Sequence, residues 1–400
     1  MKLLITGATG NLGQKLVEAL SRSTEVLVLL DQDSTEKEFL FPGVVCSLYR
    51  DLPNVLEGVD VVLHLALLNK ATDVSEDAVV AANTELTRTI AEAAPPPSVP
   101  TFINVSSLFA LEDASDMPYA RSKQASVQVL NQIDGIRVLN LYLPASTADH
   151  NANNPLVPKK LPKTLYRLAR PIFSALEPTL QIEKITEFLE TDLNSHPDGE
   201  TVFLANSSEE KLVYRLSKKL IDYGFATSVV LLFWWLLTIV WILVKFGSEG
   251  PGIFAQERVG ENGKIFTCYK FRSMGKDTRQ AGTHEVSESA VTPIGSFIRK
   301  TKIDELPQVW NILKGELSLV GPRPCLPVQE KLVAERNKRG VLDVLPGITG
   351  LAQIQGIDMS DPVRLARKDA EYIARRGLIL DLKIILATFT GKGQGDRTAK

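Results

Sequence analysis

An uncharged apolar run, GFATSVVLLFWWLLTIVWILV, extends from Gly224 to Val244 and constrains the fold more than any other feature. Its 21 residues are enough for a helix to cross the hydrocarbon core of a bilayer. Both flanks are basic, at Lys211, Arg215, Lys218 and Lys219 before the run and Lys245, Arg258 and Lys264 after it. The positive-inside rule then places both ends in the cytoplasm. One helix satisfies this by entering and returning, or by lying at the interface. A single-pass anchor and a buried soluble helix remain as alternatives.

The length and charge of the chain narrow its class. Four hundred residues indicate more than one domain. We predict a domain over 1–208, a lead-in and membrane helix over 209–248, and a second domain over 249–400. A net charge of −2 argues against nucleic acid as a partner. Three cysteines without paired spacing indicate a reducing compartment, and MKLLITGATG at the N-terminus is typical of a strand and not of a signal peptide.

The first segment has the pattern of a dinucleotide-binding turn. The strand KLLIT is followed by Gly7, Gly10 and Gly13, which open a helical pattern. Glycines let the backbone approach a pyrophosphate, and the helix N-terminus favours its charge. A second strand, EVLVLLD, ends in Asp31, whose carboxylate stands where an adenosine ribose is bound. We therefore expect a bound NAD rather than NADP, although NADP stays open.

A tyrosine and a lysine follow four residues apart in YARSK. Strand and helix patterns alternate up to this point, which predicts a doubly wound parallel sheet. Tyr119 and Lys123 share one face of a helix, so the lysine is expected to lower the phenol pKa and make it a base. Ser106 or Ser107, at the end of the preceding strand, could hydrogen-bond a substrate oxygen.

These motifs together resemble the extended short-chain dehydrogenase/reductase family, in its branch of nucleotide-sugar epimerases and dehydratases. TGATGNLG, DVVLHLA, NVSS and YARSK occur in order within residues 1 to 145. The resemblance implies bound NAD, with Tyr119 as catalytic acid/base assisted by Lys123 and a serine. Only about 85 residues separate YARSK from the basic lead-in, fewer than the family uses for a substrate lobe. A nucleotide-binding module without turnover is therefore an alternative.

The segment KTKIDELPQVWNILKGELSLVGPRP places Asp304 beside Glu305 among basic residues. Composition alone allows a solvated surface or a site for phosphate and metal. With QERVG, YKFRSM and PGITGLAQIQG it closely resembles the bacterial sugar transferases, the monotopic phosphoglycosyl transferases, over residues 212 to 392. The resemblance implies a small α/β domain with a re-entrant membrane helix. It also implies transfer of a phospho-sugar from a nucleoside diphosphate sugar, a UDP-sugar, to polyprenol (undecaprenyl) phosphate with release of UMP.

That reaction suits the residues. A carboxylate can attack phosphorus and split the transfer into two steps, and magnesium neutralises the diphosphate. By resemblance, Asp304 is the nucleophile and Glu305 holds Mg²⁺. The candidate phosphate or nucleotide contacts are Lys270, Arg272, Arg299 and Arg323.

The combined prediction is a bifunctional enzyme on the cytoplasmic face of a bacterial inner membrane, in contact with membrane lipid. Its N-terminal domain would modify the nucleotide sugar that the C-terminal domain transfers. A membrane-tethered oxidoreductase or epimerase with an inert C-terminal anchor is the alternative, and a homo-oligomer stays open. The apolar run lacks the proline that often breaks the family's membrane helix, so we expect the break near Ser228 or Thr238.

Overall fold

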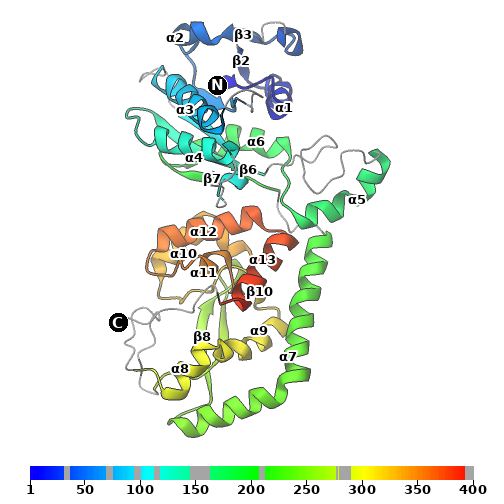
Figure 1. The fold of residues 1–400 in the computed structure, drawn as a ribbon, viewed down its shortest axis with the longest axis vertical. Helices are drawn as coiled ribbons and strands as arrows, with labels where there is room; N and C mark the ends of the chain where they lie inside the picture. Colours follow the sequence, from blue (N-terminus) through cyan, green and yellow to red (C-terminus); the bar gives the residue numbers. More distant parts are fainter. Residues whose placement is uncertain are drawn as a thin grey trace. The chain divides into compact units, whose positions relative to one another are not determined.

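The computed structural model describes residues 1–30, 37–68, 75–93, 101–111, 118–144, 163–206, 212–275, 278 and 290–391 (Figure 1). The chain forms two compact units. Unit 1 comprises Met1–Tyr166 and Pro178–Asn206, and unit 2 comprises Arg167–Glu177 and Ser207–Lys400. One helix, α5 (Lys163–Leu176), carries the chain from the first unit to the second.

Seven parallel strands form the sheet of unit 1, in the order β3-β2-β1-β4-β5-β6-β7. They are β1 (Lys2–Thr6), β2 (Glu25–Leu30), β3 (Val45–Leu48), β4 (Val61–His64), β5 (Thr101–Ser107), β6 (Arg137–Leu143) and β7 (Thr201–Phe203). Strand β1 pairs with β2 on one side and β4 on the other, so that Leu3 lies between Val26 and Val61. The order reverses beside β1, as in doubly wound dinucleotide-binding sheets. The predicted Rossmann-like fold is confirmed.

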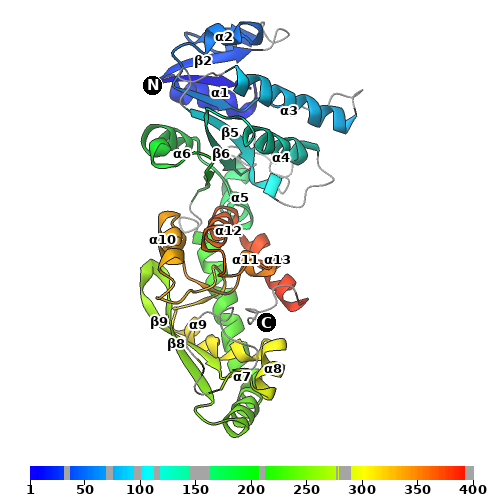
Figure 2. The ribbon, with the colours of Figure 1, turned by 90° about the vertical axis from the view of Figure 1, so that its left-hand side faces the viewer.

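Alternate side chains of these strands build the two apolar layers of unit 1. Leu3 and Ile5 face α1 (Asn11–Leu20) and α6 (Ile182–Glu187). Leu4, Val62 and Phe102 face the other layer, formed by α2 (Leu52–Val55), α3 (Glu76–Glu92) and α4 (Pro118–Leu130). This period-two division explains why the strands read as continuous apolar runs, because both faces of the sheet are covered (Figure 2).

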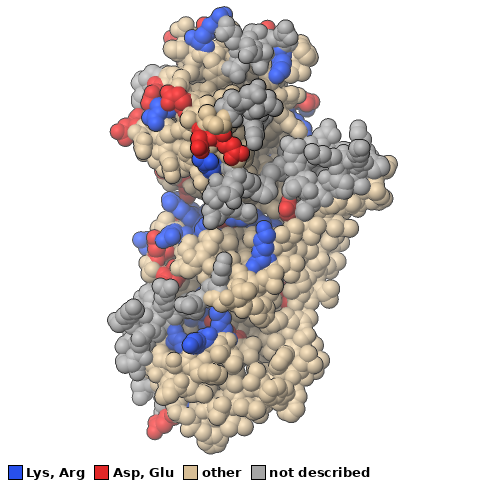
Figure 3. Space-filling model, viewed as in Figure 1, with Lys and Arg blue, Asp and Glu red and all other residues tan. Residues whose placement is uncertain are grey.

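The main part of unit 2 starts with α7 (Leu212–Gly247), a continuous helix of 36 residues. By length and composition it could cross a membrane, and only 17% of its most apolar window is buried. The alternative of a buried soluble helix is therefore wrong. Most large apolar side chains in the middle of α7 are exposed, and the surface over this helix is almost free of charge (Figure 3). These side chains are Leu231, Leu232, Phe233, Trp234, Trp235, Ile239, Trp241, Ile242 and Leu243.

The rest of unit 2 is a small α/β body. It contains an antiparallel hairpin of β8 (Ile253–Val259) and β9 (Ile265–Phe271), and a parallel pair of β10 (Ser318–Val320) and β11 (Gly347–Thr349). Its helices are α8 (Pro293–Lys300), η10 (Ile303–Gln308), α9 (Val309–Leu313), α10 (Glu330–Lys338), α11 (Leu351–Ile354), α12 (Pro362–Arg375) and α13 (Leu378–Phe389).

Polar side chains fasten the first half of α7 to this body. The Asp222 carboxylate accepts bonds from Ser318 Oγ and from the Leu319 amide, at 3.1 and 2.9 Å. One turn earlier, Lys218 Nζ donates to Asp381 Oδ2 at 3.0 Å and to the Val320 carbonyl at 2.9 Å. Because buried polar groups are costly unless paired, these bonds hold β10 at a defined position on α7.

Candidate active sites

Asp304 and Glu305 lie in the first turn of η10, a short helix of unit 2. The residue before this helix, Lys302, has φ +59°, a left-handed conformation that is uncommon for a residue with a side chain. This residue turns the chain from α8 into η10. The turn presents the two neighbouring carboxylates to β9 and to residues 321–324, the GPRP loop that follows β10.

Two cations hold the Glu305 carboxylate. Lys270 Nζ on β9 and Arg323 Nη2 in the GPRP loop both contact Glu305 Oε1, at 3.0 and 2.8 Å. All three side chains are less than one-fifth exposed. Burial alone would raise the pKa of Glu305, but these two cations lower it to about 2. Glu305 is therefore ionised throughout the physiological range.

Asp304 is in a different electrostatic environment. Burial and the neighbouring Glu305 charge raise its pKa to about 6, against the opposing effect of Lys270, Arg299 and Arg323. An ordinary aspartate pKa is near 4, so Asp304 is a markedly more basic carboxylate. Two adjacent residues thus have carboxyl groups whose pKa values are pushed apart, a pattern that accompanies separate chemical tasks.

The donor set at this site fits magnesium better than zinc. Among the described residues no cluster of three His, Cys, Asp or Glu side chains could enclose a metal. Magnesium is usually held by one or two carboxylates together with substrate phosphates, which is what Asp304 and Glu305 offer. Lys270 and Arg323 both contact Glu305 at Oε1.

A buried ion pair between Arg336 and Asp369 holds the backbone of Arg323. Arg336 on α10 donates through Nη1 to the Arg323 carbonyl at 2.8 Å. Its Nε and Nη2 both donate to Asp369 Oδ2 on α12, at 3.0 and 2.7 Å. Sequence reasoning missed both residues, because nothing in their local pattern distinguishes them from solvated charges on amphipathic helices.

The predicted phosphate contacts do not all lie together. Lys270, Arg299 and Arg323 lie close enough to Asp304 to lower its pKa, and Lys270 and Arg323 also contact Glu305. Arg272 instead is 5% exposed, and its guanidinium points to the turn after α7. It donates hydrogen bonds to the carbonyl oxygens of Pro251 and Ser248 and to Ser248 Oγ. Its guanidinium ties the end of β9 to the turn between α7 and β8, away from the carboxylate pair.

In unit 1 the glycine turn joins β1 to α1. Gly7 has φ +72°, and a Cβ there would lie 2.6 Å from the Ala66 amide nitrogen. A Cβ on Gly13 would lie 2.6 Å from the Gly7 carbonyl oxygen, while Gly10 is the N-cap residue of α1. Gly7 and Gly13 are therefore required by the close packing of turn, helix and β4. Asp31, the expected ribose contact, lies outside the described residues.

Tyr119 and Lys123 lie on α4 beside the end of β5, but their relation differs from the prediction. Lys123 is 4% exposed, and its Nζ donates to the Val105 carbonyl at 2.8 Å. Burial lowers the Lys123 pKa to about 8. The pKa of Tyr119 is raised by partial desolvation of a ring that is still 46% exposed, with a hydrogen bond to Ser107 acting in the opposite direction. The expected lowering of the phenol pKa by Lys123 is therefore wrong for this structure.

The structure separates the two candidate serines. Ser107 bonds Tyr119, whereas Ser106, one residue earlier on β5, has no partner for its buried Oγ among the described residues. Successive side chains of a strand point to opposite faces, so only one of the two can serve the tyrosine. Ser107 is the better candidate.

Comparison with known proteins divides the chain in the same way. Residues 213–393 match the family model described as bacterial sugar transferase, and residues 3–173 match the NAD dependent epimerase/dehydratase family. An uncharacterized sugar transferase, EpsL of Bacillus subtilis, is 44% identical over 162 residues, which cover 40% of this chain and 77% of that protein.

Other relatives are longer proteins. The undecaprenyl-phosphate glucose phosphotransferase of Komagataeibacter xylinus is 40% identical over 186 residues, covering 43% of this chain. The galactosyl transferase CpsE of Streptococcus agalactiae is 44% identical over 154 residues, covering 35% of this chain. The aligned part spans about a third of these two relatives, 35% and 34% of their lengths.

Solved structures resemble unit 1 in outline only. The UDP-glucuronic acid 4-epimerase of Bacillus cereus, in complex with NAD, is 18% identical, with coverage of 51% of this chain and 78% of that one. Its TM-score is 0.38, so the fold of unit 1 rests on its own strand order.

Proposed function

The chain belongs to the bacterial sugar transferase family, and we propose that unit 2 transfers a phospho-sugar from a nucleoside diphosphate sugar to polyprenyl phosphate. The donor we expect is a UDP-sugar and the acceptor is undecaprenyl phosphate. Several relatives carry these compounds in their names, including the UDP-glucose:undecaprenyl-phosphate glucose-1-phosphate transferases of Xanthomonas campestris and Caulobacter vibrioides.

One observation carries the proposal, namely the unequal pair of carboxylates in η10. Asp304 has a raised pKa of about 6 and Glu305 a lowered pKa of about 2, within reach of three cationic side chains. A nucleophilic carboxylate gains from higher basicity, whereas a carboxylate that holds a cation must stay ionised. We assign the first task to Asp304 and the second to Glu305.

In the first step, an Asp304 carboxylate oxygen attacks the phosphorus that bears the sugar. A bond forms between that oxygen and phosphorus, the bond to the bridging oxygen breaks, and UMP leaves with the bonding electrons. Lys270, Arg299 and Arg323 surround the reacting phosphate and stabilise the charge that develops on it. Magnesium, when held by Glu305 and the diphosphate, supplies further neutralisation.

In the second step, a phosphate oxygen of the prenyl acceptor attacks the same phosphorus. The acyl-phosphate bond breaks, Asp304 returns as a carboxylate, and a prenyl diphosphate sugar forms. The acceptor is a membrane lipid, and the exposed apolar middle of α7 supports a membrane location for unit 2. The basic flanks of the apolar run support re-entry at the cytoplasmic face of a bacterial inner membrane.

The test uses the full chain in lipid nanodiscs with a panel of UDP-sugars and undecaprenyl phosphate. We expect UMP as the released nucleotide, and release of UDP would overturn the assignment. Without acceptor, the intact mass of the protein should rise by one phospho-sugar. Asp304→Asn should abolish both signals, while the matched exposed-carboxylate variant Glu330→Gln should retain them. Full activity in Asp304→Asn would refute the nucleophile role.

For unit 1 we propose NAD-dependent modification of the nucleotide sugar. The supporting observation is the glycine turn together with the Tyr119–Ser107 hydrogen bond at the carboxyl end of β5. Joining this activity to unit 2 would raise the local concentration of the donor sugar beside the transferase. The alternative is a unit that binds a nucleotide without turnover.

Two measurements distinguish these alternatives. Purified protein should carry nicotinamide, seen as absorbance that responds to reduction. Turnover of nucleotide sugar should be lost in Tyr119→Phe while nicotinamide binding persists. Bound nicotinamide with no turnover of any sugar in the panel would support the binding module instead.

A further inference from the structure

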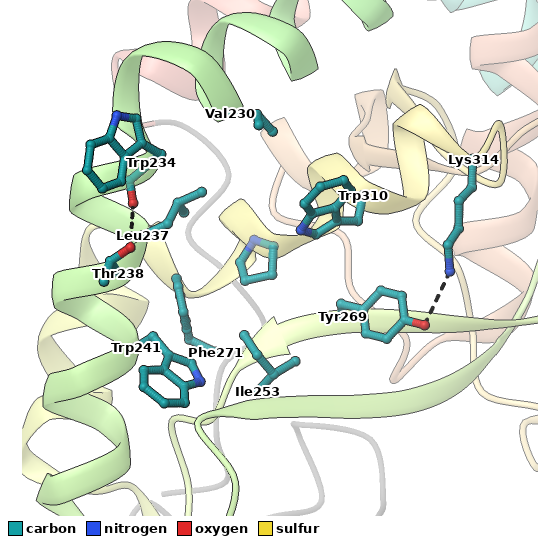
Figure 4. Close-up of a pocket in the computed structure, with 11 residues that line it drawn as sticks. Val230, Trp234, Leu237, Thr238, Trp241, Ile253, Tyr269, Phe271, Trp310 and Lys314 are labelled. Atoms are coloured by element: carbon teal, nitrogen blue, oxygen red, sulfur yellow. Dashed lines mark hydrogen bonds between the residues drawn. The ribbon is translucent and has the colours of Figure 1, made fainter.

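Unit 2 contains an apolar pocket that the carboxylate chemistry does not use. Its volume is about 620 Å³, and it lies between the second half of α7, the β8–β9 hairpin and the η10–α9 segment (Figure 4). The lining residues are Val230, Trp234, Leu237, Thr238, Trp241, Ile253, Tyr269, Phe271, Pro307, Trp310 and Lys314. A volume of this size is typical of a built ligand site.

The shape of α7 creates this pocket. The helix packs into the body of unit 2 at Ala226 and Val229 and again at Val240 and Val244, and no α7 residue between these contacts is buried. The helix also changes direction in the stretch that carries Val230 and Trp234 (Figures 1 and 4). The gap between the two packing contacts is the pocket.

Three side chains of α7 donate hydrogen bonds to backbone carbonyls on either side of this bend. Ser228 Oγ donates to the Gly224 carbonyl at 2.7 Å, and Thr238 Oγ1 to the Trp234 carbonyl at 2.9 Å. Trp235 Nε1 donates to the Leu232 carbonyl at 3.0 Å. Hydroxyl groups that bond the carbonyl four residues earlier tend to bend helices, and in lipid every carbonyl needs an internal donor.

The chemistry of the lining indicates a long apolar ligand with an anionic end. The lining has one charged residue, Lys314, whose Nζ donates to Tyr269 Oη at 3.3 Å and lies 4.9 Å from the ring centroid. Aromatic and aliphatic side chains form nearly all the rest, and Thr238 Oγ1 is engaged by its own helix. A sugar or nucleotide would leave its polar groups without partners here.

The pocket and the carboxylate pair share two elements. Tyr269 and Phe271 point into the pocket from β9, while Lys270 between them contacts Glu305. Pro307 lines the pocket from η10, the same short helix that carries Asp304 and Glu305. The pocket therefore adjoins the short helix that carries the reactive carboxylates.

We propose that this pocket binds the phosphate-proximal isoprene units of the polyprenyl phosphate acceptor, with Lys314 contacting the phosphate. The assignment rests on the proposed transferase function and locates its lipid substrate. The occupant is a prenyl phosphate rather than a bilayer phospholipid, because the pocket adjoins the turn where its phosphate must react.

The experiment measures the two half-reactions separately in nanodiscs. Thr238→Phe fills the pocket, and Lys314→Met removes its charge. Both variants should keep the wild-type UMP burst without acceptor. Lys314→Met should raise the KM for undecaprenyl phosphate about tenfold to a hundredfold, the scale of a lost charged hydrogen bond, and Thr238→Phe should raise it by occupying the space of the prenyl chain. Controls of matched chemistry are Leu231→Phe on the exposed face of α7 and Lys331→Met on α10. An unchanged acceptor KM in both pocket variants overturns the proposal.

A binding arm separates this proposal from the transferase assignment. A photoreactive prenyl phosphate should crosslink to the Trp241 or Tyr269 peptides in wild type whether or not UMP is released. Excess undecaprenyl phosphate should compete, whereas neutral polyprenol and phosphatidylglycerol should compete at least tenfold less well. Crosslinking without any UMP release would refute the transferase function alone. Equal competition by phosphatidylglycerol would show a general lipid groove and overturn the inference.

Discussion

Replacing Asp369 by asparagine would leave the Arg336 guanidinium buried without its counter-ion. Both side chains are 3% exposed, and two guanidinium nitrogens donate to one carboxylate oxygen at 3.0 and 2.7 Å. Removing one partner of a buried ion pair costs about 3–5 kcal/mol, because the remaining charge stays desolvated. An exposed pair such as Arg22–Glu18, at about three-quarters exposure, contributes at most about 1 kcal/mol.

Tryptophan fluorescence makes this loss measurable in unit 2 alone. The four tryptophans of the chain are Trp234, Trp235, Trp241 and Trp310, and all belong to unit 2. For a body of this size each kcal/mol shifts Tm by about 2–4 °C, so Asp369→Asn should lower the fluorescence Tm by about 6–20 °C. Glu330→Gln, at an exposed carboxylate of α10 in the same unit, is the control and should shift it by less than about 2 °C.

A double variant separates stability from catalysis. Arg336→Met with Asp369→Leu removes both charges and keeps an apolar volume, so Tm should recover most of the loss. The bond from Arg336 Nη1 to the Arg323 carbonyl is still gone, and Arg323 positions Glu305. The UMP burst should therefore stay slow although the protein is stable. A loss below 1 kcal/mol in Asp369→Asn, or a normal burst in the double variant, would refute this reasoning.

Three further predictions follow from the two sites. With a pKa of about 6, Asp304 is the nucleophilic anion above that pH, so the rate of the UMP burst should rise about tenfold per pH unit up to pH 6 and level off above pH 7, in quenched-flow measurements. Gly13→Ala should abolish nicotinamide binding because its Cβ would meet backbone at 2.6 Å, whereas Gly224→Ala, with open space around it, should leave binding intact. Ser107→Ala should slow sugar turnover by at least tenfold and Ser106→Ala should not, which steady-state assays with each variant would check.

Local sequence patterns predicted those features that depend on residues close together in the chain. The turn at Gly7 and Gly13 follows from a strand, a glycine spacing and a helix within 20 residues, and the structure packs it as expected. The parallel sheet follows from apolar strands that alternate with helices. The apolar run predicted a long helix from Gly224 to Val244, and α7 includes all of it, although the helix begins earlier at Leu212.

Features that depend on residues far apart in the chain could not be predicted from local sequence patterns. The pKa of Tyr119 depends on the partial desolvation of its ring and on its hydrogen bond to Ser107, and neither follows from the spacing to Lys123. Arg272 looked like a phosphate contact because it follows Lys270 on alternate positions of a strand. Its true partners are the carbonyls of Pro251 and Ser248, which the fold brings to it from the turn after α7. The pocket depends on the bend in α7. The apolar run contains no proline that would have predicted where this bend lies.

The division of labour between Asp304 and Glu305 illustrates the same distinction. The two residues are chemically alike and adjacent, so their difference must come from the fold. Glu305 receives Lys270 from 35 residues earlier and Arg323 from 18 residues later, on one oxygen. Asp304 is buried beside the charge of Glu305, and both effects raise the pKa of Asp304. The pKa of Glu305 is lowered by its two cationic partners. Exchanging the two as Asp304→Glu with Glu305→Asp would keep both charges but shift each carboxylate by a methylene. It should lose the burst, because the attack distance and the ion pairs are both set by the backbone of η10.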